Sequence, residues 1–117
     1  MVSTEFRKEL VKIMPGYAWT VHKPGPYSDG TYLEATGIQT SGSNRCSTLH
    51  VIVRRVKNGK IEYHVKSSGF GLRAPWLATA VGGTLAKSLR ALQTDYEDAA
   101  ANYQSHAAAL KRGRIAA

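Results

Sequence analysis

The chain has 117 residues, 43% of them hydrophobic, which is enough for one domain with a modest core. No apolar run approaches the roughly 20 residues that cross a membrane, and no apolar segment follows the N-terminus as in secretion signals. We therefore expect a cytoplasmic protein with no membrane partner. The single cysteine, Cys46, excludes an internal disulfide and a cysteine-rich zinc site.

The net charge of +8 is concentrated in the middle of the chain. Nine lysines and arginines lie between Thr40 and Thr94, where Glu62 is the one acidic residue, and the charges balance on either side. Such a basic segment favours a polyanionic partner, either nucleic acid or the acidic face of a protein. The sequence shows no strongly amphipathic basic helix with bulky apolar residues, which is the pattern of lipid binding.

A short helix and a strand are predicted at the start of the chain. Apolar residues at helical spacing predict a helix over residues 4–14, and Pro15-Gly16 ends it. Over residues 17–22, apolar and polar side chains alternate, which predicts a half-buried strand.

Residues 32–40 predict a second strand. Leu33 and Ala35 share one face, and a bulge at Gly37 would bring Ile38 onto that face. The following segment, SGSNRCS over residues 41–47, predicts a polar loop.

The central prediction is a β-hairpin whose turn contains Asn58-Gly59. A two-residue turn would pair Lys57 with Lys60, whereas a three-residue loop with Gly59 in the left-handed conformation pairs Val56 with Lys60. The longer loop places the apolar residues of both strands on one face. It also sets Arg54 opposite Glu62, a cross-strand pair of opposite charge worth about 0.2–1 kcal/mol. We therefore expect the three-residue loop.

This register defines two faces of the hairpin. The expected core face consists of Leu49, Val51, Val53, Ile61, Tyr63 and Val65. The expected outer face consists of His50, Ile52, Arg54, Glu62, His64 and Lys66.

A glycine-rich turn follows, and Pro75 suits the first position of a helix. From Leu77 to Leu110 the apolar residues recur at gaps of three or four, which predicts a long helix. Two places favour a break in this helix, namely Gly82-Gly83 and the capping-box spacing from Thr94 to Glu97.

The predicted fold is therefore α+β, with a short N-terminal helix, a four-stranded antiparallel sheet and a long, kinked or two-part C-terminal helix packed on one face. A single domain is expected over residues 1–112, with a frayed tail over residues 113–117.

The order of hairpin, glycine turn and Ala/Leu-rich helix resembles the double-stranded-RNA-binding domain over residues 49–92. The resemblance rests on the hairpin, Gly69, Gly71 and the helical stripe. That family has three strands and a lysine cluster where this chain has Pro75-Trp76-Leu77. A short antiparallel sheet followed by an Ala-rich helix also resembles small phage proteins that disable host defence complexes.

The sequence favours neither catalysis nor metal binding. His22, His50 and His64 are expected on the outer face, but the first and third strands of a meander lie roughly 9–10 Å apart. Only Glu34 and Glu62 are placed to orient an imidazole. Metal-binding, serine-hydrolase and phosphate-loop motifs are absent. We expect no enzyme activity, no cofactor and no metal.

The leading hypothesis is a non-enzymatic binding protein that engages nucleic acid or a nucleoprotein complex through the basic hairpin face. Aromatic residues that could stack on bases, Tyr27, Phe70 and Trp76, are expected in loops. The candidate contact residues are Arg45, Arg54, Lys57, Lys60, Lys66 and Arg73.

Two alternatives remain open. The chain could be a phage-type inhibitor or adaptor of a host defence complex, acting by protein–protein contact through the long helix and the loops over residues 24–30 and 41–47. It could also form a homodimer through the stripe of the C-terminal helix.

Overall fold

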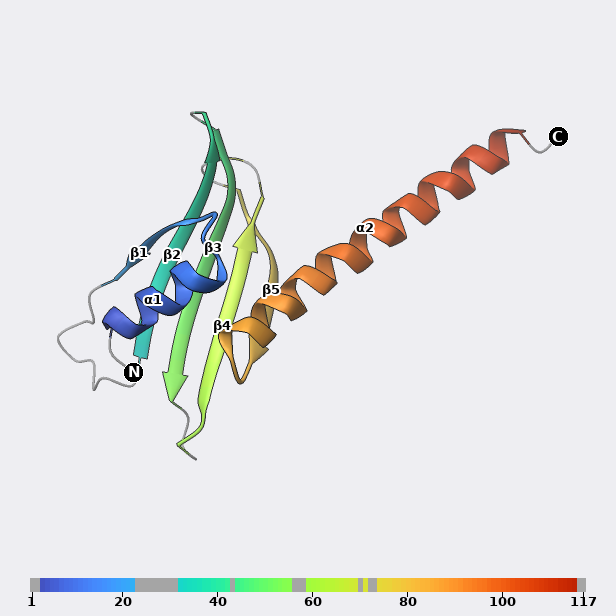
Figure 1. Cartoon of the computed structure of the whole chain (residues 1–117). Helices are drawn as coiled ribbons and strands as arrows, with labels where there is room; N and C mark the ends of the chain where they lie inside the picture. The colour runs from blue at the N-terminus through green and yellow to red at the C-terminus, as the bar shows by residue number, and fades with distance from the viewer. Residues whose placement is uncertain are drawn as a thin grey trace.

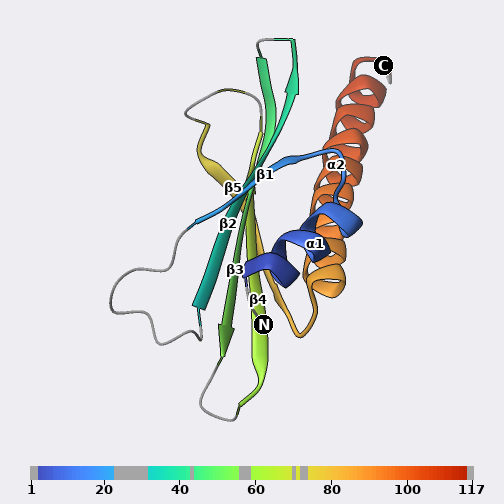
Figure 2. The same cartoon turned by 60° about the vertical axis from the view of Figure 1, so that its left-hand side comes forward.

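The computed structural model describes residues 3–22, 32–42, 44–55, 59–69, 71 and 74–115. These residues form two helices and one antiparallel sheet of five strands, so the predicted α+β class is confirmed and the predicted count of four strands is wrong. The elements are α1 (Ser3–Ile13), β1 (Ala18–Val21), β2 (Tyr32–Ser41), β3 (Asn44–Arg55), β4 (Ile61–Ser68), β5 (Trp76–Gly82) and α2 (Leu85–Ile115). The strands form a meander in chain order, and both helices lie on the same side of it (Figure 1, Figure 2).

The β3–β4 hairpin has the register that the sequence predicts. The confirmed cross-strand pairs are Val51 with Val65, Val53 with Tyr63, Arg54 with Glu62 and Arg55 with Ile61. Gly59 has a φ of 78°, the left-handed conformation that the three-residue loop requires. The predicted pairing of Val56 with Lys60 lies outside the described residues, because residues 56–58 are not among them.

The predicted first strand is confirmed as β1, and its Trp19 explains the glycine opposite it in β2. Trp19 pairs with Gly37, and a Cβ atom on Gly37 would lie 2.7 Å from the Trp19 ring. The ring therefore lies flat on the glycine backbone, held by a hydrogen bond of 3.0 Å from Trp19 Nε1 to the Met14 carbonyl. The predicted bulge at Gly37 is wrong, since the ladder shifts only between Gln39 and Thr40.

The predicted polar loop over residues 41–47 is also largely wrong. Gly42, with a φ of 62°, belongs to a short connection, and β3 already begins at Asn44. Strands β2 and β3 thus form a long hairpin, in which Ser47 accepts a hydrogen bond of 2.7 Å from the Tyr17 hydroxyl.

Strand β5 occupies the segment that was expected to begin the C-terminal helix. Its Ala78 and Ala80 are partly buried against the core, whereas Leu77 and Val81 are 60% and 57% exposed. The apolar residues at helical spacing therefore lie on the solvent side of a strand, and the side chains that pack are small. The five-stranded sheet differs from the three strands of the double-stranded-RNA-binding domain, which the sequence resembles over residues 49–92.

Helix α2 starts later than expected and is uninterrupted. The Thr84 hydroxyl caps it by accepting a hydrogen bond of 3.1 Å from the Lys87 amide. The predicted breaks are wrong: Gly82-Gly83 precedes the helix, and the helix continues through Thr94 to Ile115. Of the expected tail over residues 113–117, residues 113–115 belong to the helix and residues 116–117 lie outside the described residues.

The core lies between the sheet and the two helices. Phe6 and Leu10 of α1 are fully buried, and α2 contributes Leu85, Leu89 and Leu92 from its first turns. The rest of α2 projects away from the sheet (Figure 1), which gives the molecule extents of 66 × 38 × 25 Å. Among the described residues, no helix is both long enough and apolar enough to cross a membrane.

Candidate functional site on the open face of the sheet

Neither helix covers the sheet face opposite the core (Figure 2). Side chains that alternate with the core residues point to this side, which we call the open face. The predicted outer face of the hairpin is part of it. Its main side chains are Tyr32, Glu34 and Thr36 of β2; His50, Ile52 and Arg54 of β3; Glu62, His64 and Lys66 of β4; and Trp76, Thr79 and Val81 of β5.

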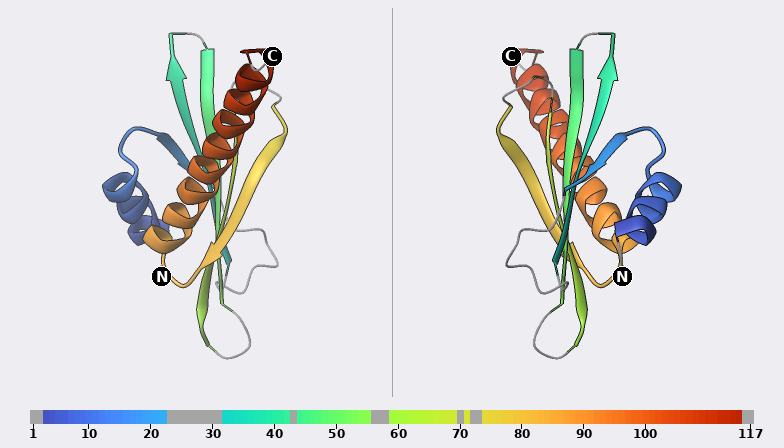
Figure 3. Two further views of the ribbon diagram at one scale, coloured as in Figure 1. Left: turned by 90° about the vertical axis from the view of Figure 1, so that its right-hand side faces the viewer. Right: turned by 90° about the vertical axis from the view of Figure 1, so that its left-hand side faces the viewer.

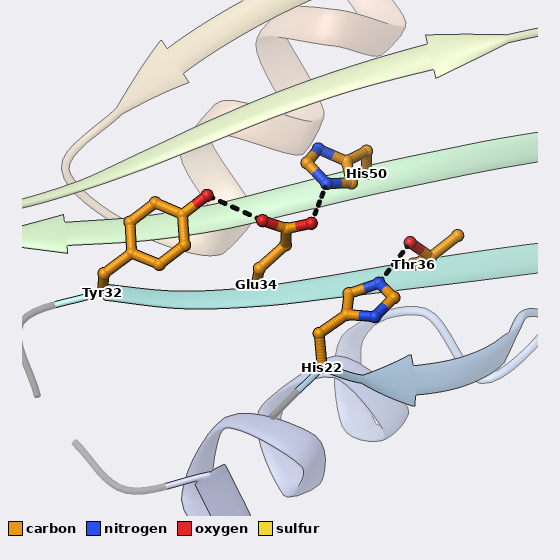
Figure 4. Close-up of polar contacts among 5 residues, drawn as sticks. All are labelled: His22, Tyr32, Glu34, Thr36 and His50. Atoms are coloured by element: carbon orange, nitrogen blue, oxygen red, sulfur yellow. Dashed lines mark hydrogen bonds and ion pairs between the residues drawn. The ribbon is translucent and has the colours of Figure 1, made fainter. Parts of the chain in front are cut away.

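A carboxylate with two polar neighbours lies on β2 (Figure 4). The Tyr32 hydroxyl donates a hydrogen bond to Glu34 Oε2 at 2.7 Å, and His50 Nε2 lies 3.0 Å from Glu34 Oε1. These two contacts lower the pKa of Glu34, with the hydrogen bond to His50 as the larger cause. The same contact with Glu34 raises the pKa of Tyr32. Glu34 is therefore held as an anion with both oxygens engaged.

The three histidines lie on the open face as expected, but each contacts a different partner. His50 contacts Glu34, and His22 Nε2 lies 2.8 Å from Thr36 Oγ1 (Figure 4). His64 Nε2 lies 2.9 Å from Glu62 Oε2. Within the part of the chain that the structure describes, no three His, Cys, Asp or Glu side chains come together as they would around a metal ion.

Lys66 and Trp76 form a cation–aromatic pair on the same face. Lys66 Nζ lies 4.5 Å from the centre of the Trp76 ring, and the His50 ring lies 6.0 Å from that ring. Trp76 is 46% exposed, so much of its indole surface is open to solvent. This pair was not predicted, because Trp76 was expected in a loop. The alternation of small and larger side chains over residues 76–82 was the signal for the strand.

The candidate contact residues are spread along the hairpin. Arg54 and Lys66 share the open face. In the β3–β4 register, Arg54 is the cross-strand neighbour of Glu62, and Lys66 is the cross-strand neighbour of His50. Arg54 and Lys66 are therefore roughly 13 Å apart along the strands, at about 3.3 Å per residue.

The other candidates lie at the ends of the hairpin or outside the described residues. Lys60 is exposed where β4 begins. Arg45 lies near the opposite end of β3, roughly 30 Å from that turn. Lys57 and Arg73 lie outside the described residues, so the structure does not place them.

Comparison with protein-family models, curated proteins and solved structures finds no significant match to this chain. The functional proposal therefore rests on the geometry and charge of the open face.

Proposed function

We propose that this chain is a non-enzymatic binding protein that engages nucleic acid, free or in a nucleoprotein complex, through the open face. The observation that carries the proposal is the exposed Trp76 ring with Lys66 beside it on an uncovered sheet. Exposed aromatic rings stack on unpaired bases, at about 1–3 kcal/mol per base, while neighbouring cations contact the phosphates. Single-stranded nucleic acid is the ligand that uses both groups.

The charges on the open face fit a moderate affinity. Arg54 and Lys66 share this face with the carboxylates of Glu34 and Glu62, each of which contacts a histidine. These four charges balance, and the exposed Lys60 adds a further cation toward the hairpin turn. Affinity from such cations depends on counterion release and therefore falls as salt increases.

The proposal predicts that Trp76→Leu and Lys66→Glu each weaken binding of labelled single-stranded RNA and DNA. Loss of stacking should cost about 1–2 kcal/mol, and loss of one phosphate contact should reduce the salt slope by about 1. Fluorescence anisotropy at low and physiological salt measures both effects, with duplexes compared in parallel.

Lys87→Glu is the matched control, because Lys87 is exposed on α2 on the covered side of the sheet and the charge change is the same. Equal losses in Lys66→Glu and Lys87→Glu would contradict the proposal. Binding that does not respond to salt would also contradict it.

The projecting part of α2 favours a second candidate function, a phage-type inhibitor or adaptor that acts by protein–protein contact. Beyond Tyr96, whose hydroxyl is hydrogen-bonded to Ser67 of β4, the helix leaves the sheet, and Tyr103 and Leu110 are 76% and 60% exposed. Capture of one protein partner that survives nuclease treatment, and is lost on Leu110→Glu, would support this function.

A further inference from the structure

The face of α2 that packs on the sheet continues past the edge of the domain. At 3.6 residues per turn, the buried Leu85, Leu89 and Leu92 lie on the same side of the helix as three further residues. These are Tyr96, Tyr103 and Leu110. Leu85, Leu89 and Leu92 are buried, and the Tyr96 hydroxyl is hydrogen-bonded to Ser67 of β4, whereas Tyr103 and Leu110 stand in solvent. We call the whole row the α2 stripe.

An open groove of about 620 Å³ borders this stripe where α2 leaves the sheet. Its lining residues belong to the end of α1, the segment after it, β3, β4 and α2. Figure 3 shows α1 and the first turns of α2 on the same side of the sheet. The apolar lining of the groove comes from Ile13, Met14, Tyr17, Leu49, Leu89 and Leu92. We call it the inner groove. The C-terminal turns of the same α2 cannot enter it, because the helix is continuous and they lie roughly 30 Å further along its axis.

The charged residues of α2 form three groups along its length. Lys87 and Arg90 lie in its first turns, Asp95, Glu97 and Asp98 follow, and Lys111, Arg112 and Arg114 lie at the far end. Of the residues in the first two groups, Arg90 and Glu97 line the inner groove. No Asp, Glu, Lys or Arg lies between the acidic group and the last basic group. Two antiparallel copies of α2 would bring opposite charges together, whereas two parallel copies would bring like charges together.

Glu97 and Lys111 fit this arrangement in more detail. Glu97 lines the inner groove and accepts a hydrogen bond of 2.8 Å from Gln93 Nε2. Lys111 lies almost four whole helical turns further on, so both residues occupy the same flank of the α2 stripe. In an antiparallel pair related by a two-fold axis, that flank of one helix meets the same flank of the other, and every contact occurs twice.

We infer that the chain forms a two-fold symmetric homodimer in which two α2 helices pair antiparallel. The last turns of each helix, with Leu110 and Lys111, seat in the inner groove of the other copy. Leu110 covers the apolar lining and Lys111 meets Glu97 on the rim. This inference is independent of nucleic-acid binding, because it uses the side of the sheet opposite the open face.

Multi-angle light scattering over a series of protein concentrations, after nuclease treatment, tests the inference. The expected mass is twice the chain mass of 12.7 kDa. Leu110→Glu should raise the dimer dissociation constant at least about tenfold, since it places a charge in an apolar groove. Ala108→Glu is the control, because it adds the same charge about 200° around the helix, away from the stripe.

A charge exchange tests the antiparallel register. Glu97→Lys and Lys111→Glu should each weaken the dimer, and the double variant should recover most of the loss. Circular dichroism confirms that each variant keeps its helix content. A monomer at every concentration would overturn the inference, even if the chain captures another protein. Masses above two copies, equal effects of Leu110→Glu and Ala108→Glu, or no recovery in the double variant would overturn it as well.

Discussion

At the scale of single residues, Glu34 shows how the open face holds a charge on a partly exposed sheet. Tyr32 and His50 each engage one of its oxygens, and the side chain is still 32% exposed. Their contacts lower the pKa of Glu34 below its ordinary value of 4.5. A carboxyl with a lowered pKa stabilises the folded state above its unfolded pKa, and this contribution disappears as the pH falls through the folded pKa.

Glu34→Gln should therefore lower the free energy of unfolding near pH 6, and the difference from the wild-type chain should shrink as the pH falls below about 4. Urea unfolding at several pH values measures this difference. Asp95→Asn serves as the control, because Asp95 is exposed on the projecting part of α2. A difference that grows toward low pH would show that Glu34 is not held as an anion in the folded protein.

At the scale of elements, the boundary between β5 and α2 depends on one cap. Thr84 follows Gly82-Gly83, and its hydroxyl accepts the Lys87 amide hydrogen bond. Gly82 also lets the helix approach the strand, because a Cβ atom there would lie 3.0 Å from the Ser88 nitrogen. The strand can therefore turn directly into a helix that packs back on the sheet.

Thr84→Ala should destabilise the fold by about 1 kcal/mol, the usual cost of losing an N-cap. Thr94→Ala should have little effect or stabilise slightly, because Thr94 lies inside a continuous helix and alanine has the higher helix propensity. Chemical denaturation of both variants compares them. A larger loss of stability in Thr94→Ala than in Thr84→Ala would place the start of the helix at Thr94.

The hairpin could be predicted from the sequence, because two independent signals agree there. The alternation of apolar and polar side chains and the Arg54–Glu62 pair select the same register. Gly59 also adopts the left-handed conformation that the three-residue loop requires. Strand β5 was not predicted, because Leu77 and Val81 continue the helical spacing of α2. The alternation over residues 76–82 is the weaker signal, because the side chains of that strand that contact the core are alanines.

The site was predictable only in part for the same reason. The register of the hairpin placed Lys66 and His50 on one face and left Glu34 as a carboxylate able to orient an imidazole. The position of Trp76 required β5, and the irregular pairing between Ser67 and Ser68 shifts the ladder next to it. Because residues 77–82 were assigned to a helix, this irregularity in the pairing of β4 with β5 could not be predicted from the sequence.

At the scale of the whole molecule, the open face and the α2 stripe belong to two different parts of the chain. The open face lies on the sheet, and the stripe lies on a long helix that is anchored to the sheet at one end. Only the first turns of α2 contribute to the core. Changes beyond Tyr96 should therefore affect assembly more than folding, whereas changes on the open face should affect binding without altering assembly.

The projecting helix also governs how the protein moves through water. The radius of gyration is 17.9 Å, whereas a compact domain of this length has about 13 Å. Hydrodynamic drag on such a rod-bearing particle exceeds that on a sphere of equal mass. Even one copy should therefore elute early from a gel-filtration column calibrated with globular standards, and sedimentation velocity should return an elevated frictional ratio. A frictional ratio typical of spheres would mean that the helix folds back in solution.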